Sequence, residues 1–307
     1  MTSETGGPAR PAARAAADGL DPDSVPVLAV PSLTGFEPAG APGASRYRHT
    51  LPGGEHVDAL LVNNHSDVLV VTFHGALNRR RFRVPRFERA RTTLQHDVSG
   101  LFIADPALCK HPDLELAWYT GWGDLDMHHV AADWAQRAAR AVGATRIVLT
   151  GSSGGGFAAL QSARFLPGSL AVPFNPQTSI YGYVPEGSYG AQRSYIGALL
   201  PEAAPHGIWS IDWTSDWTQD LGDRYSVLRS FSRPVTANVL YVDNVNDFHH
   251  EQHYLPFMAA VEHGGNQDRV RTLFYAGRDG HHPPNPDEFH AAMSAALTWV
   301  AQLPSLR

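Results

Sequence analysis

The chain has 307 residues, of which 43% are hydrophobic and 18% are charged. This composition is sufficient for one sizeable core, and a single domain of this length is common among α/β folds. The formal net charge of −6 argues against a nucleic-acid or polyanion binder. The one cysteine, Cys109, cannot form an internal disulfide, which is consistent with a reducing cytoplasm.

The first 25 residues are rich in alanine, proline, glycine and arginine, and they contain no apolar run of signal-peptide length. We predict a disordered extension over residues 1–25 and a single domain over residues 26–307. No segment approaches the ~20 consecutive apolar residues that span a bilayer. We therefore expect a cytoplasmic protein without membrane insertion, whose oligomeric state the sequence does not indicate.

Eight short apolar segments that are rich in β-forming residues are predicted strands. They cover residues 56–62, 67–73, 100–104, 114–119, 146–150, 170–174, 238–242 and 270–275. Most of the second segment is a nearly continuous apolar run, which is typical of a strand that is covered on both faces.

Helical patterns alternate with these strands in the middle and at the end of the chain. They cover residues 126–142, 155–166, 248–262 and 286–303. The alternation predicts an α/β fold in which a mostly parallel sheet has helices on both faces. Residues 181–223 break the alternation with three tryptophans and many glycines and prolines, so we expect a cap-like insertion near the open end of the sheet.

The strongest local signal is Gly151-Ser152-Ser153-Gly154-Gly155, which fits the pattern G-x-S-x-G between a predicted strand and a predicted helix. A serine on such a tight turn needs small neighbours and is lifted clear of the sheet, where it is able to act as a nucleophile. The alternatives are a plain glycine-rich turn and a phosphate-binding loop. A Walker-type loop needs a lysine, and the chain's only lysine is Lys110.

A nucleophilic serine needs a base, and the base needs an acid that orients it. In this fold the acid and then the histidine follow the serine along the chain. The predicted strand 238–242 is followed by Asp243 and Asp247, and we favour Asp247 as the acid. The predicted strand 270–275 is followed by Gly280-His281-His282, and we favour His281 over His282 as the base.

The negative oxygen that forms during acyl transfer needs backbone N–H donors. One is expected from Gly154, immediately after the nucleophile. The other is expected from the loop that begins at His74-Gly75 after an early strand, through the N–H of Gly75 or Ala76.

Taken together, the serine turn, the His74-Gly75 loop, the Asp247 loop and Gly280-His281 resemble the α/β-hydrolase superfamily. The resemblance covers about residues 55–305. It implies an eight-stranded mostly parallel sheet and a Ser-His-Asp triad, and it does not define the substrate.

Three further features have competing interpretations. Seven arginines lie between residues 79 and 91 and either grip an anionic substrate or, as we favour, form a solvated basic face. His249 and His253 are the best metal candidates, but no third ligand has a defined place, so we predict no metal and no cofactor. Aromatic residues line a substrate pocket or fill the core, and the pocket candidates are Trp118, Tyr119, Trp122, Trp209 and Trp213.

The sequence therefore predicts a serine hydrolase that cleaves a carboxylic ester or a related acyl group from a small molecule or a glycan. The alternatives are an acyltransferase that uses the same triad and a non-catalytic binding protein on the same fold.

Overall fold

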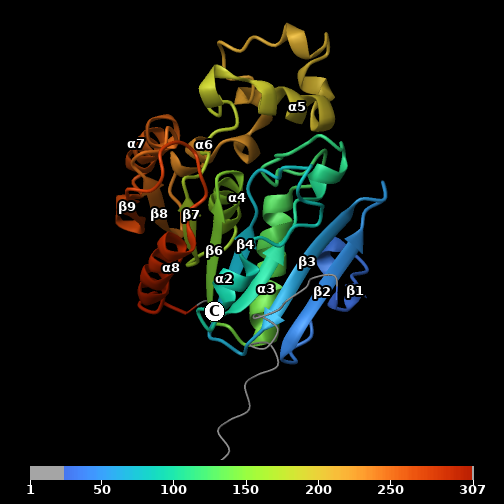
Figure 1. Cartoon of the computed structure of the whole chain (residues 1–307), viewed down its shortest axis with the longest axis vertical. Helices are drawn as coiled ribbons and strands as arrows, with labels where there is room; N and C mark the ends of the chain where they lie inside the picture. The colour runs from blue at the N-terminus through green and yellow to red at the C-terminus, as the bar shows by residue number, and fades with distance from the viewer. Residues whose placement is uncertain (1–23, 306–307) are drawn as a thin grey trace, which may run out of the picture.

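The computed structural model describes residues 24–305 and contains, within them, one nine-stranded sheet in the order β1-β2-β3-β5-β4-β6-β7-β8-β9 (Figure 1). The extension predicted over residues 1–25 falls almost entirely on residues 1–23, outside the described part. The strands are β1 (Val27–Ala29), β2 (Gly43–Thr50), β3 (His56–Asn63), β4 (Val68–Phe73), β5 (Ser99–Ile103), β6 (Arg146–Ser152), β7 (Leu170–Phe174), β8 (Asn238–Asn244) and β9 (Val270–Tyr275).

Helices cover both faces of the sheet, as predicted, because alternate strand residues point to opposite sides. Leu149 of β6 belongs to the core shared with α3, α4 and α7, whereas Val148 belongs to the core shared with α8. The helices are α2 (Ala90–Leu94), α3 (Met127–Val142), α4 (Gly154–Ala163), α5 (Gly190–Leu199), α6 (Val227–Phe231), α7 (Leu255–His263) and α8 (Pro286–Val300).

The prediction of a mostly parallel sheet is confirmed, and its strand number is corrected from eight to nine. Only the β2–β3 and β3–β5 pairs are antiparallel among the described strands. Strand β2 was missed because it contains two arginines, Arg46 and Arg48, which do not look like residues of a covered strand. In the structure both arginines form ion pairs with Asp58 of β3, which accommodates their charge within the sheet.

The predicted strand 114–119 is wrong. Its apolar residues are buried, but Trp118 and Tyr119 have φ angles of 53° and 56°, which no strand accommodates. Tyr119 donates its backbone N–H to the Asp105 carboxylate instead of to a neighbouring strand. An apolar run alone therefore did not distinguish a strand from a buried irregular segment.

The predicted helix 248–262 begins with a π-helical turn, η9 (His250–Tyr254), before α7. Pro256 lies in the first turn of α7 and has no N–H to donate to the preceding turn. The N–H of Leu255 bonds to the carbonyl of His250, five residues back. This wide turn follows directly after the loop that contains Asp247.

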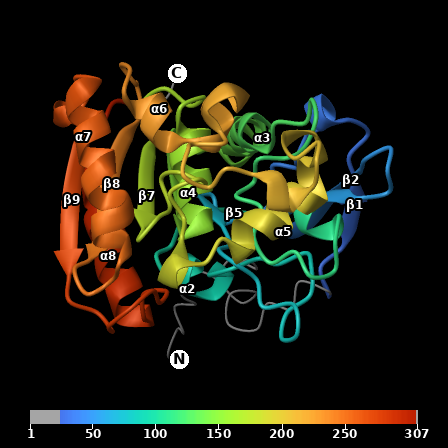
Figure 2. The same ribbon diagram turned by 90° about the horizontal axis from the view of Figure 1, so that it is seen from above.

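Residues 181–223, which contain α5, lie above the end of the sheet at which β6 leads into α4 (Figures 1 and 2). Much of this segment consists of short turns rather than regular helix. No helix within residues 24–305 is long and apolar enough to cross a membrane.

The parallel register brings the carboxyl ends of the central strands to one edge. Phe73 of β4 lies opposite Gly151 of β6, and Ser152 of β6 lies opposite Phe174 of β7. Farther along, Asn244 of β8 lies opposite Tyr275 of β9. The loops that follow these strands therefore meet above one edge of the sheet, which is where open α/β sheets bind ligands.

Candidate active site

Ser153 occupies the sharp turn between β6 and α4, with φ 59° and ψ −120°. The turn leaves no space for side chains on its flanks. A Cβ atom on Gly151 would lie 2.7 Å from the carbonyl oxygen of Phe73, and a Cβ on Gly155 would lie 2.4 Å from the same oxygen. The two glycines of the pattern are therefore required by the close approach of β4.

Ser153, His281 and Asp247 form a continuous hydrogen-bonded chain. The Ser153 Oγ lies 2.8 Å from His281 Nε2, and His281 Nδ1 lies 2.7 Å from the Asp247 carboxylate. Because an ionised carboxylate only accepts, Nδ1 carries the proton and donates it to Asp247. Nε2 is then the bare nitrogen that accepts the hydrogen bond from the serine hydroxyl.

The other sequence candidates for acid and base lie nearby in different contacts. Asp243 is fully buried at the end of β8 and accepts a hydrogen bond from His250 Nδ1 at 2.5 Å. Burial raises the pKa of Asp243. His282 lines the same cavity as Ser153, but it is His281 that contacts the serine and Asp247.

The fully buried Gln177, three residues after β7, also reaches the serine. Its side-chain Nε2 lies 2.6 Å from the Ser153 Oγ, and its Oε1 accepts a hydrogen bond from the indole Nε1 of Trp118 at 3.1 Å. Its backbone N–H also donates to the Ser153 carbonyl oxygen.

The loop after β4 lies against the serine turn, with the Gly75 backbone close to Ser153. The Gly75 N–H donates to the carboxylate of Glu88 at 3.1 Å. Within residues 24–305, neither the Ala76 N–H nor the Gly154 N–H has a protein acceptor. Gly154 is the first residue of α4, where backbone N–H groups have no partner inside the helix.

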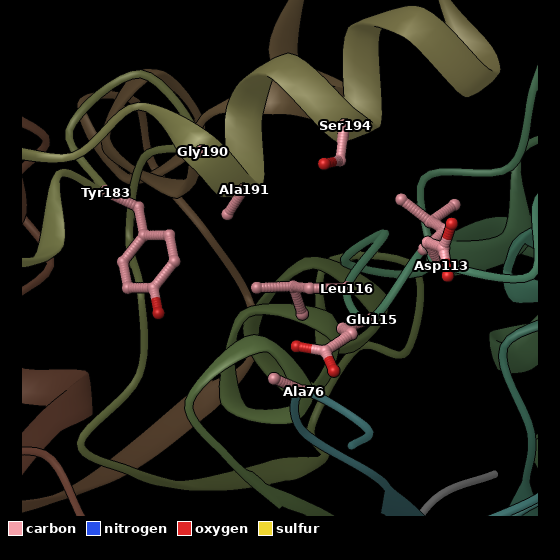
Figure 3. Close-up of a pocket in the computed structure, with 9 residues that line it drawn as sticks. Ala76, Asp113, Glu115, Leu116, Tyr183, Gly190, Ala191 and Ser194 are labelled. Carbon is pink, nitrogen blue, oxygen red and sulfur yellow. The ribbon is translucent and has the colours of Figure 1, made fainter. Parts of the chain in front are cut away.

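One cavity contains Ser153 in its lining, and a second cavity shares Ala76 and Tyr183 with it. The first has a volume of about 160 Å³, and its lining includes Ser153, Glu88 and His281. The second has a volume of about 220 Å³ and lies between the 113–116 segment and the insertion (Figure 3). The insertion contributes Tyr183, Gly190, Ala191 and Ser194 to the second cavity.

His249 stacks on the catalytic candidate His281, with ring centroids 3.8 Å apart and planes tilted by 31°. Its Nδ1 donates to the carbonyl oxygen of Asn175 at 2.8 Å. Burial and the neighbouring His253 and His281 lower the pKa of His249 well below its usual value. Burial lowers the pKa of His253 to about 3. Both rings are therefore neutral.

Asp247, His249 and His281 each offer a possible metal ligand atom, and these atoms lie within 4.8 Å of one another. The two ring nitrogens of His281 contact Ser153 and Asp247, and the Nδ1 of His249 donates to Asn175. These nitrogens are therefore engaged in hydrogen bonds within the protein. A shared ion needs free lone pairs. The geometry therefore fits ring stacking better than metal coordination.

The aromatic pocket candidates do not line either cavity. Trp118 and Tyr119 are almost fully buried, whereas Trp209 is 79% exposed and lies under the guanidinium of Arg193. Trp213 packs on Tyr189, and the ammonium of Lys110 lies over Trp122.

None of the seven clustered arginines is among the residues that line the two cavities. Arg79 donates to the carbonyl oxygens of Leu108 and Leu114, and the Arg89 Nη2 donates to that of Pro284 at 2.5 Å. These two arginines tie loops together.

The sequence reasoning missed Gln177, Glu88, Tyr183 and the stacking of His249. One signal was available for Gln177, because a polar residue shortly after a central parallel strand lies at the edge where the site forms. The other three reach the site through the long loop after β4, the insertion and the π-helical turn, whose paths the sequence pattern does not encode.

No family model matches the sequence, and no curated protein matches it either. Solved structures do resemble it in fold. The capsule O-acetyltransferase of Neisseria meningitidis serogroup A matches with a TM-score of 0.53 and 14% identity, over 81% of this chain and 95% of that one. Puromycin hydrolase matches with a TM-score of 0.56 and 19% identity, over 89% of this chain and 42% of that one.

A Glycosylation Associate Protein complex from Streptococcus agalactiae matches with a TM-score of 0.51 and 15% identity, over 84% of this chain and 45% of that one. At these identities the likeness concerns the fold. With the nine-stranded, mostly parallel sheet and the helices on both of its faces, it shows that this chain has the α/β-hydrolase fold.

Proposed function

We propose that the protein is a serine hydrolase that cleaves a carboxylic ester or a related acyl substrate through an acyl-serine intermediate. The observation that carries this proposal is the continuous contact from Ser153 through His281 to Asp247. A serine hydroxyl is a weak nucleophile unless a base oriented by a third group accepts its proton. Here His281 is the base, and Asp247 fixes its tautomer.

The first step is attack on the substrate carbonyl. The Ser153 proton passes to His281 Nε2 while Oγ bonds to the carbonyl carbon and the π electrons move to the carbonyl oxygen. The N–H groups of Ala76 and Gly154 bind this oxygen, because both lack an acceptor within the described residues. Ala76 is favoured over Gly75, whose N–H already donates to Glu88.

The second step releases the acyl group. His281 returns its proton to the leaving alcohol as the bond between the acyl carbon and that alcohol breaks. It then accepts a proton from water, whose oxygen attacks the acyl carbon, and passes this proton to the Ser153 Oγ as the acyl–Oγ bond breaks and the acid leaves. The cavity of about 160 Å³ beside Ser153 is small compared with ligand pockets of roughly 300–1,000 Å³. We therefore expect a short acyl group here, with the rest of a small-molecule or glycan substrate in the second cavity.

Labelling with a fluorophosphonate probe tests the proposal. The wild-type protein is compared with Ser153→Ala and with Ser162→Ala, which removes a buried hydroxyl of α4 that has no hydrogen-bond partner among residues 24–305. We expect labelling of the wild type and of Ser162→Ala and none of Ser153→Ala. Absence of labelling in folded wild-type protein would instead favour a non-catalytic binding protein.

Acyl transfer to an alcohol is the second candidate, and the second cavity favours it because it shares Ala76 and Tyr183 with the cavity of Ser153 and so offers an acceptor a place next to that cavity. One protein of similar fold is a capsule O-acetyltransferase. Turnover of p-nitrophenyl acetate in the presence of added sugar alcohols distinguishes the two reactions. Acetate as the main product indicates a hydrolase, and an acetylated alcohol indicates a transferase.

A further inference from the structure

The geometry points to Gln177 as a fourth catalytic residue, whose side-chain amide stabilises negative charge on the Ser153 Oγ; this inference rests on the proposed function. The amide Nε2 lies 2.6 Å from Oγ, which is closer than His281 Nε2 at 2.8 Å. Gln177 is completely buried, so water does not compete for this contact.

The orientation of the amide is defined by its second contact. The indole N–H of Trp118 is a donor only, so the amide atom that faces it at 3.1 Å is the oxygen. The amide nitrogen must then face Ser153. Trp118 is itself fully buried, and its carbonyl oxygen accepts a hydrogen bond from His128 Nε2 at 2.8 Å. Trp118 therefore acts as a positioning residue for Gln177.

The hydrogen-bond inventory of the serine oxygen is compatible with attack. A hydroxyl oxygen has one proton and two lone pairs. The Ser153 proton is directed to His281 Nε2, and one lone pair accepts the Gln177 N–H. The second lone pair remains free to form the bond to the substrate carbon.

This contact strengthens during the reaction. Stabilisation by Gln177 requires that proton transfer to His281 runs ahead of the bond to carbon, so that partial negative charge develops on Oγ before it passes to the carbonyl oxygen. A hydrogen bond to a charged oxygen is roughly twice as strong as one to a neutral oxygen. An interaction that is stronger in the transition state than in the ground state accelerates the step. The Gln177 N–H also stabilises Oγ during release of the acyl group. When the acyl–Oγ bond breaks, its electron pair returns to Oγ before His281 protonates that oxygen.

The test measures labelling by the fluorophosphonate probe and kcat and KM for p-nitrophenyl acetate. Gln177→Met removes the donor, and Gln177→Glu keeps an acceptor for Trp118 while it removes the N–H. Gln161→Met is the matched control, because Gln161 is also fully buried but contacts Arg164, Ser230 and Asp223. Thermal melting checks that each variant is folded.

We expect both Gln177 variants to react about 100-fold more slowly in labelling and in kcat, with KM unchanged, because removal of one charge-stabilising donor typically costs ~100- to 1,000-fold. Gln161→Met should react as the wild type does. Trp118→Phe should also lower kcat, because it removes the donor that orients the Gln177 amide. The double variant Trp118→Phe/Gln177→Met should have the same kcat as Gln177→Met alone, because both changes act through that amide.

Wild-type reactivity that persists in both Gln177 variants would overturn this inference and leave the proposed function in place. A raised KM with unchanged kcat would also overturn it, since the residue would then bind substrate. Failure of the wild type itself to label would instead contradict the proposed function.

Discussion

Ser153 has a backbone conformation that non-glycine residues rarely adopt, with a positive φ of 59°. Such strain costs of order 1–3 kcal/mol and persists only where the surroundings impose it. Here the surroundings are the Phe73 carbonyl, which excludes side chains at Gly151 and Gly155, and the Phe174 carbonyl, which accepts the Ser153 N–H. The position of Ser153 is therefore fixed by contacts with both neighbouring strands, β4 and β7.

Asparagine substitutions distinguish the two aspartates after β8. Asp247→Asn removes the charge that holds His281 in its working tautomer, so kcat should fall by roughly 10,000-fold. Asp243→Asn should leave kcat unchanged, because Asp243 contacts His250 rather than His281. Steady-state hydrolysis of p-nitrophenyl acetate measures both. A larger loss in Asp243→Asn than in Asp247→Asn would exchange the roles of the two residues.

At the scale of elements, the segment just before α2 contacts two other parts of the candidate site. Glu88 accepts the Gly75 N–H from the loop after β4, and the adjacent Arg89 donates to the Pro284 carbonyl of the loop that carries His281. The Arg89 guanidinium also lies 4.9 Å from the ring centre of Phe289 in α8. Two neighbouring residues thus connect the Gly75 turn with the loop that carries His281.

Arg89→Ala should loosen the histidine loop, because the Pro284 carbonyl loses its donor. A displacement of about 1 Å of a catalytic group is able to cost ~100-fold in rate. We expect kcat to fall by ~10- to 100-fold with a small change in KM. Arg86→Ala is the control, since Arg86 lies over the Phe82 ring. Equal kinetics of the two variants would contradict a role for Arg89 in holding the loop.

The elements that the sequence predicted well are those whose residues alternate between two buried faces. Strands β4, β6, β7 and β8 are of this kind, and the loops after three of them contain the predicted Gly75, Ser153 and Asp247. Elements that depend on distant partners were missed. Strand β2 needs Asp58 of β3, and the Trp118 segment needs the Asp105 carboxylate, so neither is visible in its own residues.

The whole molecule contains neutral histidines buried on the carboxyl side of the sheet. Burial lowers the pKa of His128 from 6.5 to about 4 and the pKa of His253 from 6.5 to about 3. Both rings are buried in the folded protein and become exposed when it unfolds, so their protonation is linked to the unfolding of the domain.

The sign of this linkage follows from the lowered pKa values. Below pH 6.5 the unfolded chain binds protons that the folded chain does not, so the free energy of unfolding falls as the pH falls. Each such histidine contributes a slope of up to ~1.4 kcal/mol per pH unit. His253→Gln should reduce the slope between pH 6.5 and pH 5, as measured by urea unfolding. The same slope in variant and wild type would contradict the linkage.

The arrangement of the whole molecule also explains why the shape of the cavities could not be predicted from the sequence. The order of serine, acid and histidine follows from the topology and was predictable. The shape of the cavities was not, because Tyr183 reaches them from the insertion and Glu88 from a long loop, and both depend on packing between distant segments.

The separation of Ser153 and His281 along the chain has a consequence for the order of synthesis. The two residues touch in the folded protein but lie 128 residues apart in sequence. A ribosome makes Ser153 well before it makes His281, and the strands β7, β8 and β9 lie between them. On the proposed function, a nascent chain that ends after β6 therefore has the serine without its base, and the contact between Ser153 and His281 forms only after β9 has been made.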